Sequence, residues 1–508
     1  MKNTLIILFI AASVLFLNGC EKGLDPQLYG TLSPTTFPSN EQEYELYMIE
    51  LYKPFMGSWG YQEAGTDWTN GFFCPERGHL VMLDMPSDIF TAFTQWGGFW
   101  EGQSTCNFDY MLNESKAESH FEKVRFVTRA TKIIGDLEKS DLSEAAKTQF
   151  VAEARLARGW IMSFLLNYFG PVPVILDYDI VGDVEAESNL SRPSRESFVA
   201  AIAEDLRYAA DNLEKDPPEY GRFNKGLGLT LLMRLYMNEK DFVNAESVGR
   251  EITTLGYQLV DDYASLFREA TEQNTENIWA VSCSPENDEL KNFNPIAFYC
   301  YPEDYPGDKV INGGWGDGVF MVTWDFYDSF DPADERRLFV TEYTRRPSTV
   351  RPGQDAVRTR TSNPAMRGAL IRKFPDEGIE GGYQGNDIIL ARYADVLLML
   401  AEAINNNNGG PTTEAIALVE SVRIRANIGP LAAEDIASQQ AFNDAILRER
   451  GWELYLEGFR KTDLIRHGKW PSALAAVAGK NADAPALCPI PSYAINNSEG
   501  KLTQNDGY

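Results

Sequence analysis

The chain has few of the residues that usually hold metal ions or form redox sites. It contains 3 histidines and 6 cysteines in 508 residues, and their spacing matches neither an HExxH motif nor a CxxC pair. The sequence therefore predicts neither a catalytic zinc site nor any cofactor. The cysteines other than Cys20 are odd in number, so disulfides are possible but none is predicted. We interpret most of these cysteines as small buried hydrophobic residues.

Basic residues are scarce relative to acidic ones. The chain has 46 Lys and Arg against 74 Asp and Glu, which gives a formal net charge of -28. Such an excess repels phosphate backbones and anionic lipid headgroups at long range, so nucleic acid is a poor candidate partner. It is compatible with neutral or cationic ligands. Hydrophobic residues make up 44% of the chain, enough for the large core of a globular protein.

A long apolar run that could cross a membrane is not evident at the N-terminus. The first residues, "MKNTLIILFIAASVLFLNGC", contain one Lys and an apolar run that is too short and too early for a membrane span. This layout is typical of a bacterial secretion signal. "LNGC" resembles a lipobox, although Asn18 is unusual there, and predicts cleavage before a lipidated Cys20; a plain signal or an uncleaved anchor is the alternative. Residues 1–19 are then the signal peptide and 20–40 an extended tether.

Helical periodicity begins after the tether and predicts a mostly α fold. "SEAAKTQFVAEARLARGWIMSFLLNYFG" is a long amphipathic helix with Ser143 as its N-cap, and "GPVPV" ends it. "GLGLTLLMRLYMNEK" and "DFVNAESVGREITTLG" predict two helices joined by a tight turn at 238–241. Ala245 and Gly249 are expected where these helices approach closely. The pair resembles a tetratricopeptide hairpin without the full consensus.

The periodicity is lost between about residues 257 and 385. Short strand-like runs such as "NIWAVSC" alternate there with glycine, proline and aromatic clusters. Helices are expected to resume at "DIILARYADVLLMLAEAINN". We therefore predict one domain over 41–508, with helical hairpins at about 41–256 and 386–470 and an irregular insertion at about 257–385. A loop-rich insertion in a helical scaffold often holds the functional site.

Several motifs, in this order, resemble the SusD/RagB family of outer-membrane lipoproteins from Bacteroidetes. They are "CEKGLDPQ", "ARLARGWIMSFLLNYFGPVPVI", "ARYADVLLMLAEAINN" with Asp395 in place of the usual Glu, "RERGWELYLEGFRKTDLIRHGK" with Gly451 where Arg is common, and the closing "QNDGY". The resemblance runs from Cys20 to Tyr508. It implies about four tetratricopeptide-like hairpins with a less regular insertion, and a place on the outer face of the outer membrane.

The same resemblance implies a partner and a role. Members of the family sit over a SusC-type TonB-dependent transporter and capture oligosaccharides, or in some cases peptides, which they pass to it. They take part in nutrient uptake and polysaccharide utilization, and they are not enzymes. We therefore expect a surface glycan-binding lipoprotein; a peptide or other nutrient ligand on the same fold is the alternative, and a glycoside hydrolase is a remote one.

The stretch "AILRERGWELYLEGFRKTDLIRHGKW", residues 445–470, concentrates acid and base groups. On a single helix its acidic residues and His467 would fall within an arc of about 120°, while apolar residues surround nearly the whole circumference. The pattern favours a buried helix whose carboxylates are ion-paired. The expected partners lie nearby or on the two preceding helices: Arg448, Arg450, Arg460, Arg392, Arg423 and Arg425. A glycosidase would need two carboxylates facing each other across an open cleft, which one buried face does not provide.

Carbohydrate binding calls for aromatic faces and hydrogen-bonding groups on loops. Glycine-rich and irregular stretches outside the helices offer them, and the predicted ligand-binding residues are Trp59, Trp68, Trp96, Tyr301, Asn312 and Trp315. For each aromatic residue the alternative interpretation is that it packs in the core. Trp100, Trp279 and Trp324 are expected in the core. "DPADE", residues 331–335, could hold calcium but lacks the spacing of an EF-hand loop, and no metal is predicted.

Overall fold

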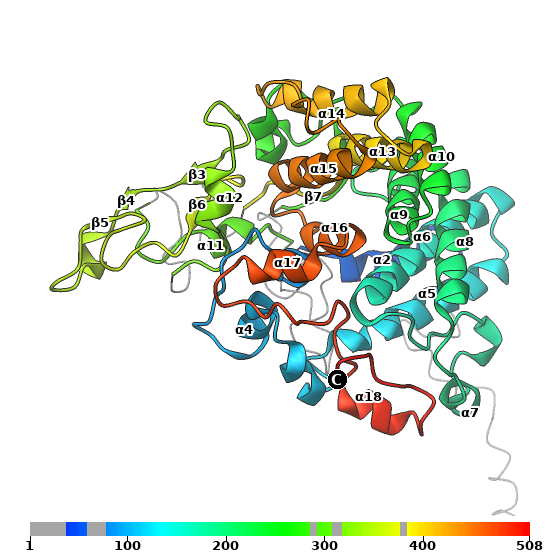
Figure 1. Cartoon of the computed structure of the whole chain (residues 1–508). Coiled ribbons are helices and arrows are strands. Elements are labelled where there is room, and N and C mark those ends of the chain that lie inside the picture. The colour runs from blue at the N-terminus through cyan, green and yellow to red at the C-terminus, as the bar shows by residue number, and fades with distance from the viewer. Residues whose placement is uncertain (1–36, 58–77, 285–291, 307–316, 376–383) are drawn as a thin grey trace, which may run out of the picture. The chain divides into compact units, whose positions relative to one another are not determined.

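The computed structural model describes residues 37–57, 78–284, 292–306, 317–375 and 384–508 (Figure 1). The chain divides into a unit that ends at Tyr47 and a unit from Met48 to Tyr508, and each is considered by itself. The first unit contains the start of helix α2 (Glu41–Tyr52), where Asn40 Oδ1 accepts a hydrogen bond from the Glu43 N–H at 3.1 Å. All elements that follow belong to the second unit.

Helices supply most of the regular structure, as the sequence predicts. They are α3 (His79–Leu83), α4 (Gly98–Thr105), α5 (Val124–Glu138), α6 (Glu144–Phe169), α7 (Val184–Ser188), α8 (Arg195–Asn212), α9 (Lys225–Asn238), α10 (Phe242–Thr253), α11 (Ile296–Cys300), α12 (Trp324–Asp328), α13 (Tyr393–Asn408), α14 (Thr413–Arg425), α15 (Gln439–Leu454), α16 (Arg460–Arg466), α17 (Trp470–Ala475) and α18 (Ser492–Asn497). The predicted start of α6 is confirmed, because the Ser143 hydroxyl accepts a hydrogen bond from the Ala146 N–H at 3.3 Å. Gly170, with φ of 76°, follows its last residue.

Consecutive helices pack side by side as a scaffold of tetratricopeptide type. α5 packs against α6, α6 against α8, α8 against α9, and α9 against α10 (Figure 1). α10 in turn packs against α13, which follows the insertion, and α13 packs against α14. The close approach predicted at Gly249 is confirmed. A Cβ atom there would lie 2.6 Å from Met233 Cε and 3.1 Å from Leu400 Cδ1, so glycine allows α10 to contact both α9 and α13.

The insertion contains most of the strands. They are β1 (Asn277–Val281), β2 (Met321–Val322), β3 (Phe339–Val340), β4 (Tyr343–Thr344), β5 (Val357–Arg358), β6 (Ala369–Ile371) and β7 (Ile388–Arg392). β6 lies between β2 and β3, β4 pairs with β5, and β1 pairs antiparallel with β7. The strand predicted at "NIWAVSC" is therefore confirmed.

The helix expected to begin at "DIILAR" begins later. Ile388 to Arg392 form β7, every residue of which is buried, and the helix starts at Tyr393. A short apolar run buried on both faces has no alternation that would distinguish a strand from a buried helix, and the β-branched isoleucines favour the strand.

The stretch 445–470 is also not one helix. α15 ends at Leu454, and the chain turns through Leu456, with φ of 60°, and Gly458, with φ of 85°, before α16 begins. The Asp84 carboxylate fixes this turn by accepting hydrogen bonds from the N–H groups of Gly458 at 2.8 Å and Arg460 at 3.0 Å. The prediction of a single helix is wrong because a leucine at positive φ depends on tertiary contacts that its residue type does not indicate.

The ion-pair interpretation of this stretch is confirmed. Five carboxylates and five cations form one connected cluster in the interior, here called the ionic cluster: Glu276, Asp334, Glu449, Glu453 and Glu457 with Arg336, Lys373, Arg392, Arg423 and Arg425. Glu453 is 0% exposed and contacts Arg336 at 3.1 Å as well as Arg392 and Arg425. Its surroundings leave no open cleft for a substrate. Sequence proximity could not reveal Arg336 and Lys373, which come from the insertion.

The three arginines of the stretch that were expected as local partners lie outside the ionic cluster. Arg450 contacts Asp395 at 2.7 Å and Asp463 at 2.8 Å. Arg448 contacts Asp435 at 2.8 Å, and Arg460 contacts Asp88 at 2.7 Å. The local candidates therefore link the C-terminal helices to other elements and do not neutralise Glu453.

Candidate ligand-binding site

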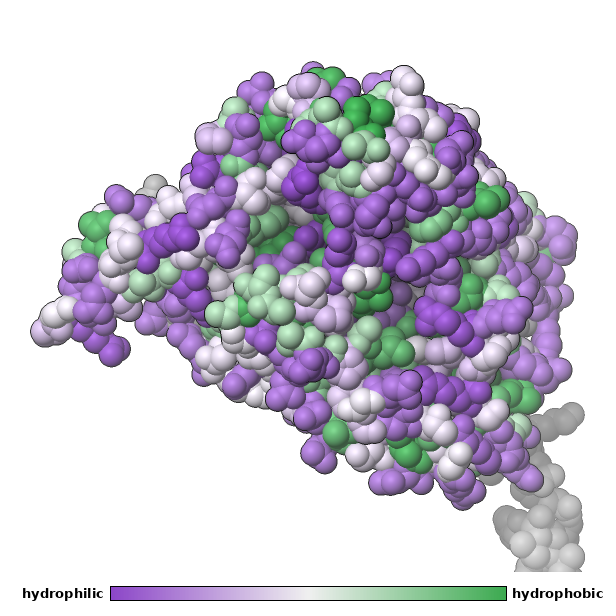
Figure 2. Space-filling model, in the orientation of Figure 1, coloured by the Kyte–Doolittle hydropathy of each residue, from purple (hydrophilic) through white to green (hydrophobic). Residues whose placement is uncertain are grey.

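A cavity of about 830 Å³ opens between α12 of the insertion and the C-terminal helices α15 and α17. In Figure 2 the surface is hollowed where these elements meet, and both hydrophilic and hydrophobic residues surround the hollow. Its walls also include part of the segment before α4, at Asp88, Thr91 and Ala92. Three segments that are far apart in the sequence thus form one site.

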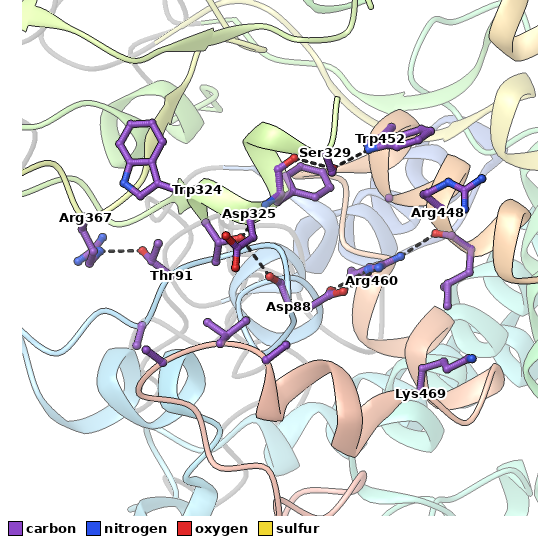
Figure 3. Close-up of a pocket in the computed structure, with 18 of the residues that line it drawn as sticks. Asp88, Thr91, Trp324, Asp325, Ser329, Arg367, Arg448, Trp452, Arg460 and Lys469 are labelled. Atoms are coloured by element: carbon purple, nitrogen blue, oxygen red, sulfur yellow. Dashed lines mark hydrogen bonds and ion pairs between the residues drawn. The ribbon is translucent and has the colours of Figure 1, made fainter. Parts of the chain in front are cut away.

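Two partly exposed tryptophans lie on opposite sides of this cavity (Figure 3). Trp324 begins α12, and its Nε1 donates a hydrogen bond to the Met366 carbonyl at 3.3 Å. Trp452 lies in α15, and its Nε1 donates to Ser329 Oγ at 2.9 Å. Because each indole nitrogen is bonded to a fixed group, the ring orientations are held. Two such rings are suited to the apolar faces of sugar rings.

Guanidinium groups accompany both rings. The Arg360 guanidinium carbon lies 5.0 Å from the Trp324 ring centroid, and that of Arg448 lies 5.5 Å from the Trp452 centroid. Both arginines are exposed, and Arg360 is also paired with Asp328 at 2.6 Å. These positions combine a stacking surface with donors that could bond sugar hydroxyls.

Polar groups with fixed geometry complete the wall. Arg460 forms a bidentate pair with Asp88, at 2.8 and 2.7 Å, and donates to the Leu447 carbonyl at 2.7 Å. Burial raises the pKa of Asp88, but Arg460 outweighs burial and holds that pKa below its usual value. Asp444 and Lys469, which also line the cavity, form an ion pair at 3.0 Å. The cavity rim therefore contains charges of both signs.

Arg367 connects the cavity to the segment that leads to Trp96. Its Nε donates to Thr91 Oγ1 at 2.7 Å, its Nη2 donates to the Gly318 carbonyl at 2.7 Å, and its guanidinium carbon lies 5.1 Å from the Phe93 ring centroid. Burial lowers the pKa of Arg367 to about 10, so it stays charged at neutral pH. Within the described ranges it has no carboxylate partner within 4.0 Å.

A model of the SusD family matches residues 340–508. A SusD-like protein from Formosa agariphila is 23% identical over 515 residues, which cover 92% of this chain and 90% of that protein. Residues 340–508, the C-terminal third of the chain, thus belong to the SusD family. The starch-binding protein SusD from Bacteroides thetaiotaomicron is 23% identical over 432 residues, covering 72% of this chain and 74% of SusD.

A solved structure shows a shared fold that extends beyond the matched C-terminal third. Surface glycan-binding protein A from Bacteroides thetaiotaomicron, in complex with laminarihexaose, superposes with a TM-score of 0.68. The sequences are 18% identical, and the match covers 91% of this chain and 99% of that protein. The two proteins therefore share a fold across almost the whole of this chain.

The residues predicted from sequence have different outcomes in the structure. Trp59, Trp68, Asn312 and Trp315 lie outside the described residues, as does Cys20. Trp96 is partly exposed, and its ring meets Phe93 and Trp100 edge-on at 4.8 and 5.2 Å. It follows the cavity wall in the chain but does not line the cavity.

One expectation about an aromatic residue is wrong, and another is confirmed only in part. Tyr301 is 0% exposed and packs on Tyr305 with ring centroids 4.7 Å apart, so its ring has no free face for a ligand. Trp324 was expected in the core, and it is half-buried against the core residues Met321 and Met366, but it also lines the cavity. Trp100 and Trp279 are buried, as expected.

Trp452 was missed because its helix was treated as buried on most sides. One local signal was available, since Arg448 precedes Trp452 by one helical turn and the two side chains contact each other. An arginine and a tryptophan at that spacing mark a face of the helix that reaches solvent. The opposite wall, from α12, could not be found from local spacing.

Metal ligation finds no support in the described part of the chain. No group of three or more His, Cys, Asp or Glu side chains there is arranged to hold an ion. In "DPADE", the carboxylate of Asp334 is bonded by Arg336 at 2.8 Å. Among the described helices, none is long and apolar enough to cross a membrane.

Proposed function

We propose that this protein is a surface lipoprotein that binds a glycan in the cavity between Trp324 and Trp452. The observation that supports this most strongly is the pair of partly exposed indoles, each fixed through its nitrogen, at a cavity of about 830 Å³. Aromatic faces exclude water from the apolar face of a sugar, and the surrounding Asp, Arg, Ser and Thr groups can bond its hydroxyls. The volume accommodates a short stretch of oligosaccharide.

The names of relatives support the same ligand class. One curated relative is named a starch-binding protein, and solved structures of the same fold include a laminarihexaose complex and a laminarin-binding SusD-like protein. Those names describe the relatives. For this protein they support a glycan ligand. The cavity rim contains both carboxylates and guanidinium groups, which favours a glycan that is neutral or carries charges of both signs.

The proposed role is binding without turnover. Glycoside hydrolysis needs one carboxylic acid that can give up a proton and a second carboxylate across the sugar. Asp88 is held ionised by its bidentate pair with Arg460. Glu453 and its neighbours are enclosed in the ionic cluster. Neither supplies a proton donor in an open cleft.

The protein would act at the outer membrane with a partner. Lipidation of Cys20 would anchor the chain, and residues 21–40 would act as the tether. A SusC-type TonB-dependent transporter would receive the bound glycan. Trp96, on the segment that continues from Thr91 and Ala92, would provide an additional aromatic face for a longer chain.

Affinity electrophoresis against a panel of polysaccharides, followed by calorimetry with a retained oligosaccharide, tests the proposal. We expect Trp324→Ala and Trp452→Ala each to weaken binding about tenfold, the loss of roughly one stacking interaction. Trp96→Ala is the matched variant outside the cavity and should have a smaller effect on short oligosaccharides. The melting temperature of each variant checks that the fold is retained.

The outcomes separate the alternatives. Retention by a glycan that both cavity variants weaken supports the proposal. Binding to peptides but to no glycan would replace it with the peptide alternative. Glycan binding that Trp96→Ala abolishes and the cavity variants leave unchanged would move the site to the Trp96 segment.

A further inference from the structure

A second hollow, of about 180 Å³, is lined by basic residues. Three arginines at its wall define what we call the arginine cleft: Arg268, after the 3-10 turn Tyr263–Phe267, Arg337, before β3, and Arg372, after β6. Lys373 also lines it, and no acidic residue does. This is unusual in a chain of net charge -28, in which acidic residues outnumber basic ones.

The three arginines have no carboxylate partner in the described ranges. None of them takes part in an ion pair within 4.0 Å or in a side-chain hydrogen bond, whereas most other arginines in the structure do. Lys373 differs, since it is buried, paired with Glu457 and bonded to the Tyr455 carbonyl at 2.6 Å. The cleft therefore presents uncompensated positive charge from three separate segments of the insertion and its border.

Arg337 adds an unsatisfied buried donor. Its guanidinium carbon lies 4.1 Å from the Tyr327 ring centroid, which fixes the side chain against α12. Its Nε is buried and has no hydrogen-bond acceptor. A buried donor without a partner costs free energy, and three like charges around one hollow repel each other. A bound anion would relieve both costs.

We propose that the arginine cleft binds an oxyanion group, such as a sulfate, phosphate or carboxylate. Arginine donors match the paired oxygens of these groups, and charge-assisted bonds of this kind are the stronger hydrogen bonds in proteins. The group is either a free inorganic ion or a substituent of an acidic saccharide; the volume holds one such group with part of a sugar ring.

The arginine cleft is separate from the tryptophan cavity. α12 contributes to both, because Trp324 and Phe326 line the cavity while Tyr327 contacts Arg337. The two sites have no lining residue in common. Anion binding can therefore fail while glycan binding at the cavity succeeds, and the reverse also holds.

Calorimetry at low ionic strength tests the proposal with three ligands: inorganic sulfate, a sulfated oligosaccharide and its desulfated counterpart. The double variant Arg268→Gln/Arg372→Gln changes two exposed side chains, and Arg337→Gln changes the buried donor. Arg351→Gln, an exposed arginine outside the cleft, is the control for the loss of one charge. We expect at least a tenfold loss of anion affinity in both cleft variants and little change in the control.

The ligands distinguish the source of the anion. Binding of sulfate alone assigns the cleft to a free ion, and tighter binding of the sulfated than of the desulfated sugar assigns it to an acidic saccharide. The proposal is overturned if the wild-type protein binds neither anion, or if the cleft variants and Arg351→Gln bind them with equal affinity.

Discussion

Replacing Glu453 with glutamine should destabilise the protein strongly. The carboxylate is 0% exposed and contacts Arg336, Arg392 and Arg425. The substitution leaves five cations with four carboxylates in the ionic cluster. It also places an NH₂ group, a donor, among guanidinium donors. Breaking a buried ion pair from one side costs about 3–5 kcal/mol, and we expect a loss in that range for the free energy of unfolding.

The pKa of Glu453 supports this magnitude. Burial raises the pKa of the carboxyl, but the arginines, Arg425 foremost, outweigh burial and hold it well below the usual range. The interaction with its neighbours therefore exceeds the cost of removing the charge from water. Losing that interaction while leaving the arginines buried is the reason for the large expected effect.

Urea unfolding followed by circular dichroism measures the change. Glu414→Gln is the matched control, because Glu414 is half-exposed and pairs with Arg250 at 2.8 Å on the surface. It should cost less than about 1 kcal/mol. A loss below about 1 kcal/mol for Glu453→Gln would refute the argument. The argument would also be refuted if the wild-type protein hydrolysed a glycan and Glu453→Gln abolished that hydrolysis without changing stability, because Glu453 would then be a catalytic residue.

Two other predictions concern a buried acid and the membrane anchor. Burial raises the pKa of Asp387 to about 6, above the value of about 4 that an aspartate has in the unfolded chain. Between these two pH values the folded protein binds a proton that the unfolded chain does not. The free energy of unfolding therefore falls as the pH rises through this window. Urea unfolding at pH 4.5 and 7.5 should therefore show Asp387→Asn gaining stability relative to wild type, by on the order of 2 kcal/mol, as the pH rises; a pH-independent difference would refute this. Cys20→Ala should move the protein from the membrane to the soluble fraction after cell fractionation, and retention in the membrane would show that Cys20 is not the lipid anchor.

Local signals in the sequence identified the helical scaffold correctly. The boundaries of α6 follow from a capping serine and a terminal glycine, both read within a few residues of the helix ends. The close packing at Gly249 follows from residue size. Such features depend on neighbours in sequence, so one sequence is enough to predict them.

The features that depend on distant contacts were harder to predict. Arg336 reaches Glu449 and Glu453 from more than a hundred residues away. The turn at Leu456 depends on Asp84, which bonds the backbone that follows it. The same holds for the candidate site, because the cavity forms where α12, α15 and the segment near Thr91 meet. Residue types suggested that aromatic residues bind the ligand, which stays a prediction, but they did not indicate which tryptophans would share a cavity.

A crystal structure of the protein with an oligosaccharide from a polysaccharide that it retains is the most direct test of the central claim. The account predicts sugar rings in the cavity, with their apolar faces on the indoles of Trp324 and Trp452 and their hydroxyls bonded by groups of the rim. A glycan bound at another surface while this cavity contains no sugar would contradict it.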